Sequence, residues 1–227
     1  MSPRILFVLT SADKSLTGKP TGWYLPEAAH PYYILAPHAE IDFAAPGGAN
    51  PPLDPGSAEN FKADADCTKF LADAAVQQKL ATAKRLADVD AKDYDAVFYV
   101  GGHGPVIDLA SDPVNAALAS AFFQAGKVTA AVCHGPAALV QAVDATGASI
   151  FKGREATGFS NAEEIAIDQV KAIPFLLEDR INELGGKYVK ADAAWAPKVV
   201  VDGNLITGQN PASAGPIGQA ILKALQK

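Results

Sequence analysis

Two adjacent residues near the middle of the chain, Cys133 and His134, have side chains suited to nucleophilic chemistry. They lie in the segment AVCHG (131–135), with a small residue two places before the cysteine and a glycine two places after it. This is the spacing of a nucleophile elbow, a strained strand-to-helix turn that exposes its central side chain and needs small neighbours. A thiol there lies at the N-terminus of the following helix, which favours the thiolate and lowers the thiol pKa. We predict that Cys133 is a nucleophile; a small apolar core residue is the alternative.

The remaining cysteine and the histidines narrow the chemistry. Cys67 follows Asp66, whose negative charge opposes thiolate formation, so we predict a structural thiol. No histidine follows His134, although papain-like enzymes and glutamine amidotransferases place the base histidine downstream of the cysteine. Both layouts are therefore excluded, and the base is His134 or a carboxylate. Because consecutive side chains diverge, we expect no close ion pair between Cys133 and His134, and a third group must hold the imidazole ring.

Short β-branched runs alternate with longer helical patterns, which is typical of a parallel sheet covered on both faces. We predict one α/β domain over residues 1–227. The predicted strands are 4–9, 41–44, 96–100 and 128–132, with a hairpin over 199–207 that turns at Asp202-Gly203. The predicted helices are 69–86, 113–125 between Asp112 as N-cap and Gly126 as C-cap, and a last one from about residue 210.

Composition excludes several classes of protein. The 227 residues include 19 basic and 25 acidic ones, giving a net charge of −6, and no Lys/Arg cluster that could meet nucleic-acid phosphates. The apolar run at 5–9 is too short for a signal peptide or a membrane span. With two cysteines and a chain long enough to bury a core, we expect free thiols in the reducing cytoplasm and no membrane or nucleic-acid partner.

Six segments spread along the whole chain resemble the DJ/PfpI superfamily, and within it the heat-shock chaperone branch that includes the glutathione-independent glyoxalases, called glyoxalase III. These segments are ILFVLTS (5–11), GWYLPEAAHP (22–31), GGHG (101–104), AAVCHGP (130–136), TGFSNAEE (157–164) and LITGQNPAS (205–213). The resemblance implies a flavodoxin-like sandwich of class I glutamine-amidotransferase type, with a central, mostly parallel sheet and helices on both faces. It also implies a homodimer.

The resemblance assigns residues to roles. The family's nucleophile falls on Cys133 and its histidine on His134, while the buried glutamate that hydrogen-bonds the sulfur falls on Glu27. The acidic member of the triad falls on Glu164, and the adjacent Glu163 stays open as the alternative. Beside a thiolate in a closed pocket, desolvation and like charge both raise a carboxyl pKa, so we expect a protonated Glu27. The alternative for Glu27 is a solvated glutamate in the first turn of a helix.

The segment GGHG (101–104) follows a predicted strand at the carboxyl edge, where open α/β sheets place their sites. The backbone N–H groups of Gly102 and His134 are our candidates for an oxyanion hole. His103 lines the pocket or is a structural histidine. The glycine spacing matches neither a P-loop nor a dinucleotide fingerprint. We predict no metal site and no cofactor, since the histidines and cysteines form no metal-ligand pattern.

The resemblance implies a cofactor-independent lyase of glyoxalase III type (D-lactate dehydratase). Such an enzyme converts methylglyoxal to lactate, and glyoxal to glycolate, through a cysteine hemithioacetal. A second class is also open, a stress-responsive holding chaperone for misfolded client proteins or a redox sensor, with protein deglycase activity compatible and protease or amidase activity least supported. Holding clients requires an exposed apolar surface, for which the candidates are the loop at Pro51-Pro52 and residues 173–177.

Overall fold

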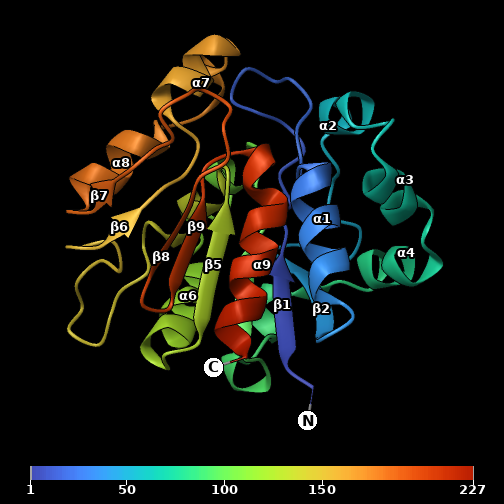
Figure 1. Ribbon diagram of the computed structural model, residues 1–227, viewed down its shortest axis with the longest axis horizontal. Coiled ribbons are helices and arrows are strands. Elements are labelled where there is room, and N and C mark those ends of the chain that lie inside the picture. Colours follow the sequence, from blue (N-terminus) through green and yellow to red (C-terminus); the bar gives the residue numbers. More distant parts are fainter. Residues whose placement is uncertain (1, 227) are drawn as a thin grey trace.

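A seven-stranded sheet forms the centre of the computed structural model, which describes residues 2–226 (Figure 1). Its strand order is β3-β2-β1-β4-β5-β9-β8, and every neighbouring pair is parallel except β8 with β9. The strands are β1 (Arg4–Val8), β2 (Glu40–Ala45), β3 (Lys84–Arg85), β4 (Ala96–Tyr99), β5 (Val128–Val132), β8 (Val199–Asp202) and β9 (Leu205–Gly208). A separate two-stranded ribbon joins β6 (Glu155–Ala156) to β7 (Lys187–Tyr188).

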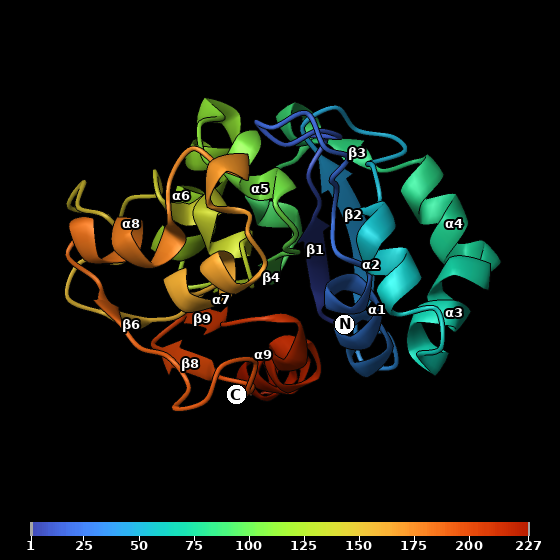
Figure 2. The ribbon, with the colours of Figure 1, turned by 90° about the horizontal axis from the view of Figure 1, so that it is seen from above.

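Helices cover both faces of the sheet (Figure 2). The helices of the described residues are α1 (Leu25–Leu35), α2 (Pro55–Asn60), α3 (Ala65–Ala72), α4 (Ala74–Ala81), α5 (Gly104–Ile107), α6 (Pro113–Gln124), α7 (Asn161–Ala166), α8 (Leu177–Glu183) and α9 (Ala214–Leu225). Strand β1 shows why two layers are needed: Ile5 and Phe7 pack into the core under α1 and α9, while Leu6 and Val8 pack into the core under α5 and α6. Successive strand residues point to opposite faces, so an apolar run must be covered twice. The predicted mostly parallel, flavodoxin-like sandwich is confirmed.

Most predicted elements are present. The four predicted parallel strands agree with β1, β2, β4 and β5 to within one residue at each end, and the hairpin is β8–β9 with Gly203 at φ +61°. The Asp112 side chain caps α6 by accepting from the Val114 N–H at 2.8 Å, and Gly126 follows the helix at φ +70°. These signals are local, which is why sequence alone locates them.

The predicted helix over 69–86 is wrong. The chain forms α3 and α4 instead, and the two helices are separated by Asp73, whose backbone is extended at φ −72° and ψ 112°. Its carboxylate accepts hydrogen bonds from the N–H groups of Ala75 and Val76, so Asp73 ends one helix and caps the next. The last helix also begins later than predicted, at Ala214, after a 3-10 turn over Pro211–Ser213.

The two segments expected to expose apolar surface do so in part: Pro174 is exposed, and Pro52, Phe175 and Leu176 are half-buried. Pro51 is buried, and Ile173 and Leu177 lie in the core beneath α6 and α8. Hydrophobic side chains in a sequence indicate burial at least as strongly as they indicate a docking surface. Within residues 2–226 no helix is both long and apolar enough to cross a membrane.

A buried amide connects α6 to the segment that follows β5. Asn115 is fully buried, and its Nδ2 donates to the backbone oxygens of Leu109 at 3.0 Å and Ala138 at 2.7 Å. Ala138 belongs to the 3-10 turn η3 (Gly135–Leu139) directly after Cys133. Asn115 therefore fixes the scaffold beneath the predicted nucleophile.

Replacing Asn115 with alanine leaves the Ala138 oxygen without a donor among the described residues, and leaves the Leu109 oxygen with only the bond from the Asp112 N–H at 3.4 Å. Each buried polar group left unpaired costs about 1–3 kcal/mol, so we expect Asn115→Ala to lower the free energy of unfolding by about 3 kcal/mol in urea titrations. The matched control is Asn204→Ala: Asn204 also donates to two backbone oxygens, of Phe123 and Lys127, but it is partly exposed. Water can replace those bonds, so the loss should stay below about 1 kcal/mol. Equal losses would contradict this account.

Candidate active site

The predicted site residues meet at the carboxyl edge of the parallel strands. Glu27 comes from the first turn of α1, His103 follows β4, Cys133 follows β5, and Glu164 lies in the first turn of α7. Figure 1 shows α7 and the start of α1 at the upper end of β1 and β5. The strand order brings these segments together although they are far apart in sequence.

Cys133 occupies a strained turn with a left-handed backbone, φ +59°. Its N–H donates to the Gly208 oxygen at 2.9 Å, and its own oxygen accepts from the Phe159 N–H at 2.8 Å. A Cβ on Gly135 would lie only 2.5 Å from the Tyr99 oxygen, so that position requires glycine. The predicted elbow conformation is present. The α-helix that we expected after the elbow is absent from residues 135–139, where the chain forms the five-residue 3-10 turn η3 instead.

Glu27 is completely buried beside the cysteine. A Cβ on Gly101 would lie 2.3 Å from Glu27 Oε2 and 2.9 Å from Cys133 Cβ, so only glycine at 101 allows this approach. Neither Glu27 oxygen meets the geometry of a regular hydrogen bond to residues 2–226. Burial raises the Glu27 pKa well above its ordinary value, and the opposing contributions of the Cys133 side chain and the Gly101 backbone are smaller. The neutral carboxylic acid is therefore the favoured form.

The thiol pKa moves in the direction opposite to the sequence prediction. Burial, followed by the proximity of Glu27, raises the Cys133 pKa well above its ordinary value, while the Gly102 backbone N–H acts to lower it. The prediction of a lowered pKa depended on a long helix after the elbow, and η3 supplies no comparable dipole. The resting site therefore holds a thiol, which requires a base when it reacts.

His134 lies closer to the thiol than predicted. Its Nδ1 is 3.4 Å from Cys133 Sγ, because the left-handed cysteine backbone turns the two consecutive side chains toward each other. On the other side of the ring, Nε2 lies 2.6 Å from Glu164 Oε2. The second oxygen of Glu164 lies 2.8 Å from His103 Nε2. One carboxylate therefore holds two imidazole rings whose centroids are 4.3 Å apart.

The two adjacent glutamates point to different neighbours. Glu164 meets the two histidines, whereas Glu163 belongs to a capping box with Ser160 at the start of α7. Glu163 also accepts hydrogen bonds from the side chains of Gln209 and Asn210. Glu164 is therefore the glutamate in contact with His134.

The charges at this contact fix the imidazole tautomer. Burial acts to raise the Glu164 pKa, but His134 and His103 outweigh it and hold that pKa at about 2. Burial and then His103 lower the His134 pKa, although Glu164 acts to raise it. An ionised Glu164 accepts a hydrogen bond from a neutral ring, so the hydrogen lies on Nε2 and the lone pair of Nδ1 faces the thiol.

These groups line a cavity of about 90 Å³ with largely aromatic and aliphatic walls. Gly102 and His103 lie at the cavity beside Cys133 and His134, and its walls are Tyr24, Phe159, Ile167, Trp195 and Pro211. No sequence pattern indicated the role of these wall residues, although Tyr24, Phe159 and Pro211 lie within the family-like segments. A larger depression of about 710 Å³ between α6 and residues 86–91 is open and lined by no histidine or cysteine.

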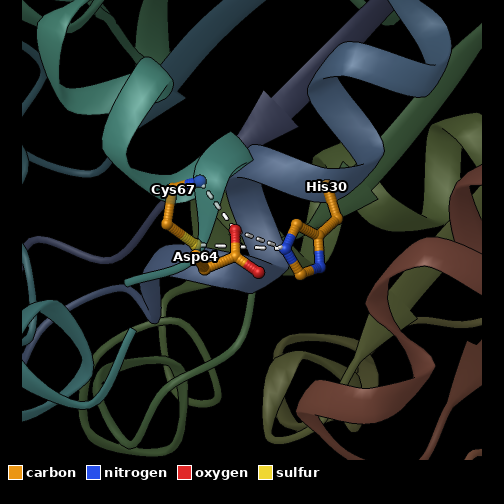
Figure 3. A group of neighbouring side chains, drawn as sticks. All are labelled: His30, Asp64 and Cys67. Carbon is orange, nitrogen blue, oxygen red and sulfur yellow. Dashed lines mark hydrogen bonds and ion pairs between the residues drawn. The ribbon is translucent and has the colours of Figure 1, made fainter. Parts of the chain in front are cut away.

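Among the described residues, two groups of side chains are close enough to hold a metal ion, although the sequence pattern predicted no metal site. One is His103, His134 and Glu164, whose ligand atoms lie within 4.8 Å of one another. Both Glu164 oxygens there already accept from the rings, so an ion would replace the contacts just described. The other group lies outside this cavity, at His30, Asp64 and Cys67 (Figure 3).

The chain is similar to known proteins over its whole length. The glutathione-independent glyoxalase HSP31 of Saccharomyces cerevisiae is 32% identical over 236 residues, covering 100% of both chains. The structure of the Rapid Encystment Protein 24 kDa of Francisella tularensis superposes with a TM-score of 0.93 at 36% identity, covering 98% of this chain and 99% of that one. For glyoxalase III of Candida albicans the TM-score is 0.88 at 27% identity, covering 98% and 97%. The model of the DJ-1/PfpI family matches residues 57–224, so the chain belongs to the DJ-1/PfpI family.

Proposed function

We propose that this protein is a glutathione-independent glyoxalase that converts methylglyoxal to lactate, and glyoxal to glycolate, through a hemithioacetal on Cys133. One observation carries the proposal: the Cys133 thiol lies between a buried, neutral Glu27 and the Nδ1 lone pair of a His134 held by ionised Glu164. Such a site can activate a thiol and move protons in a small closed cavity. The names of the yeast relatives support the same activity.

In the first step the Cys133 sulfur bonds to the aldehyde carbon. The thiol proton passes to His134 Nδ1, 3.4 Å away, and from there to the former aldehyde oxygen, which gives the hemithioacetal. The N–H groups of Gly102 and His134 are the donors that we propose for the developing oxyanion. In support, the His134 N–H has no backbone acceptor within residues 2–226, and the Gly102 N–H lies close enough to the sulfur to lower the Cys133 pKa.

The second step moves a proton between adjacent carbons. The carbon bonded to sulfur loses its hydrogen as a proton, and the neighbouring carbonyl carbon gains one through an enediol, with Glu27 and His134 as the proton carriers within reach. The product is a thioester next to a secondary alcohol. Water then cleaves the thioester to lactate and the free thiol. One carbon is oxidised and its neighbour reduced, so methylglyoxal plus water equals lactate with no external redox partner.

The cavity favours short substrates. Its volume of about 90 Å³ leaves room for only a few non-hydrogen atoms or several water molecules, which suits a 2-oxoaldehyde better than a peptide.

The enzyme class that we propose is a lyase of the D-lactate dehydratase type. The proposal further includes a single domain over residues 1–227 and a cytoplasmic homodimer that consumes the small aldehyde. Client holding is a separate activity of the second class, for which the loop at Pro51-Pro52 and residues 173–177 offer only a small exposed apolar surface.

Removing the nucleophile tests the proposal directly. We expect Cys133→Ala to lower kcat/KM for glutathione-free loss of methylglyoxal by at least about 1000-fold, because no covalent intermediate can form. Lactate formation should fall in parallel. Cys67→Ala is the matched control, because Cys67 lies on α3 outside the cavity, and it should retain activity. Unchanged turnover in folded Cys133→Ala would sink the proposal.

The roles of the two glutamates can be separated by isosteric substitution. Glu164→Gln removes the charge that fixes the His134 tautomer, so kcat/KM should fall by at least about 100-fold with little change in melting temperature. Glu163→Gln should show the reverse, a lower melting temperature with kcat/KM within about 10-fold, because Glu163 accepts several hydrogen bonds that hold α7. A larger catalytic loss in Glu163→Gln than in Glu164→Gln would assign the triad position to Glu163.

The proposed role of His134 as the base predicts how kcat/KM depends on pH. His134 must be neutral to accept the thiol proton, and its pKa is lowered from 6.5 by burial and His103. Activity should therefore persist as the pH falls through 6.5, and the acid limb of kcat/KM should have its midpoint below that value. Because Glu164 acts to raise the His134 pKa, the residual activity of Glu164→Gln should titrate at still lower pH. A midpoint above 6.5 in the unmodified protein argues against His134 as the base.

A further inference from the structure

Three side chains of types that bind metals meet outside the catalytic cavity. His30 lies on α1, Asp64 is the N-cap of α3, and Cys67 lies in the first turn of α3. His30 Nε2 is 3.1 Å from Asp64 Oδ1 and 4.0 Å from Cys67 Sγ. Figure 3 shows all three side chains directed toward a common point between the two helices.

We propose that His30, Asp64 and Cys67 form a binding site for a divalent ion of the zinc type, with the fourth position open to solvent. Imidazole nitrogen, carboxylate oxygen and thiolate sulfur are the ligands that zinc takes in proteins. A thiolate disfavours magnesium and calcium, which prefer oxygen ligands. Sequence spacing gave no sign of this group because His30 and Asp64 are 34 residues apart and come from different helices.

The distances fit a tetrahedral ion. With bonds of about 2.3 Å to sulfur and about 2.0 Å to nitrogen and oxygen, a tetrahedral centre places sulfur about 3.6 Å from nitrogen and nitrogen about 3.3 Å from oxygen. The corresponding separations between Cys67, His30 and Asp64 are 4.0 and 3.1 Å. The third separation, from the Cys67 sulfur to the Asp64 oxygen, is at most 4.8 Å, so side-chain rotations on α1 and at the start of α3 can bring the three atoms to tetrahedral distances.

The exposure and the charges of these three side chains also suit a divalent ion. The side chains of His30 and Asp64 are 24% and 32% exposed, so an ion can enter and keep a water, while Cys67 is buried and lies at the inner end of the group. The carboxylate and a thiolate together balance the two charges of the ion. Asp66 adds a further negative charge near Cys67. No lysine or arginine pairs with Asp64 within residues 2–226.

Without an ion, Asp64 acts as the N-cap of α3. Asp64 Oδ1 accepts from the Cys67 N–H at 2.9 Å as well as facing His30. Burial and the Asp64 carboxylate raise the Cys67 pKa to about 12, so the metal-free site holds a thiol. Binding then replaces the thiol proton with the ion, and the proton leaves to the buffer.

The ion would connect the two helices close to the catalytic centre. Glu27 and His30 are one turn apart on α1, so an ion bound to His30 also restrains the helix that carries Glu27. Binding to the folded state alone stabilises the protein in proportion to ion concentration. The expected consequence is a higher melting temperature, with α1 and α3 held together.

Cobalt absorption tests the proposal, because Co²⁺ occupies zinc sites and a thiolate–Co²⁺ bond gives a charge-transfer band in the near ultraviolet. Titrating the reduced full-length protein with CoCl₂ should give this band at one ion per chain, and ZnCl₂ should displace it. Cys67→Ser should lose the band, and His30→Gln should bind at least about 10-fold more weakly. ZnCl₂ should raise the melting temperature of the unmodified protein but not of Cys67→Ser.

Cys133→Ala is the matched control, since the other metal-capable group lies beside Cys133. Its band should be unchanged, and loss of the band there would place the ion in the catalytic cavity and overturn the proposal. No band in the unmodified protein, or an equal band in Cys67→Ser, would also overturn it. Asp64→Asn keeps an N-cap side chain, so this variant should fold normally yet bind Co²⁺ at least about 10-fold more weakly. Unchanged affinity in that variant would remove Asp64 from the site.

Discussion

The left-handed backbone of Cys133 is the constraint on which the rest of the site depends. A non-glycine residue in that region costs about 1–2 kcal/mol, and two backbone hydrogen bonds hold it there, to Gly208 and from Phe159. Glycine at positions 101 and 135 removes the side chains that would collide with the turn and with Glu27. The same backbone turn brings the imidazole next to the thiol.

Two buried glutamates adopt opposite charge states because their neighbours differ. Glu27 faces a thiol and has no cationic partner, so burial dominates and its pKa rises. Glu164 is nearly as buried, but two imidazoles outweigh burial and hold its pKa at about 2. The site therefore contains a proton donor and a fixed anion on opposite sides of the sulfur and imidazole pair. Such a division of two carboxyls between acid and anion is how one fold performs both acid and base chemistry near neutral pH.

Sequence alone located the features that depend on local signals. The parallel strands, the hairpin, the Asp112 cap and the elbow followed from periodicity, turn residues and small-residue spacing. Sequence patterns did not locate the features that depend on a particular backbone angle or on a tertiary contact. Asp73 can continue a helix or cap one, and only packing of α3 and α4 selects the cap. The 3.4 Å approach of His134 to Cys133 requires a positive φ that the sequence does not state. The cavity walls at Ile167 and Trp195 come from segments that no motif connects.

Helix α7 connects the chemistry to the shape of the cavity. Its first turn presents Glu164 to the imidazoles, and the preceding Glu163 accepts from the backbone N–H of Trp195 at 3.3 Å. Trp195 is 44% exposed and stands at φ +65°, so this contact and its packing on Phe159 hold a strained segment over the cavity. Glu163 and Glu164 are adjacent on α7, so the same turn that holds the catalytic imidazole in place also holds the Trp195 segment at the cavity.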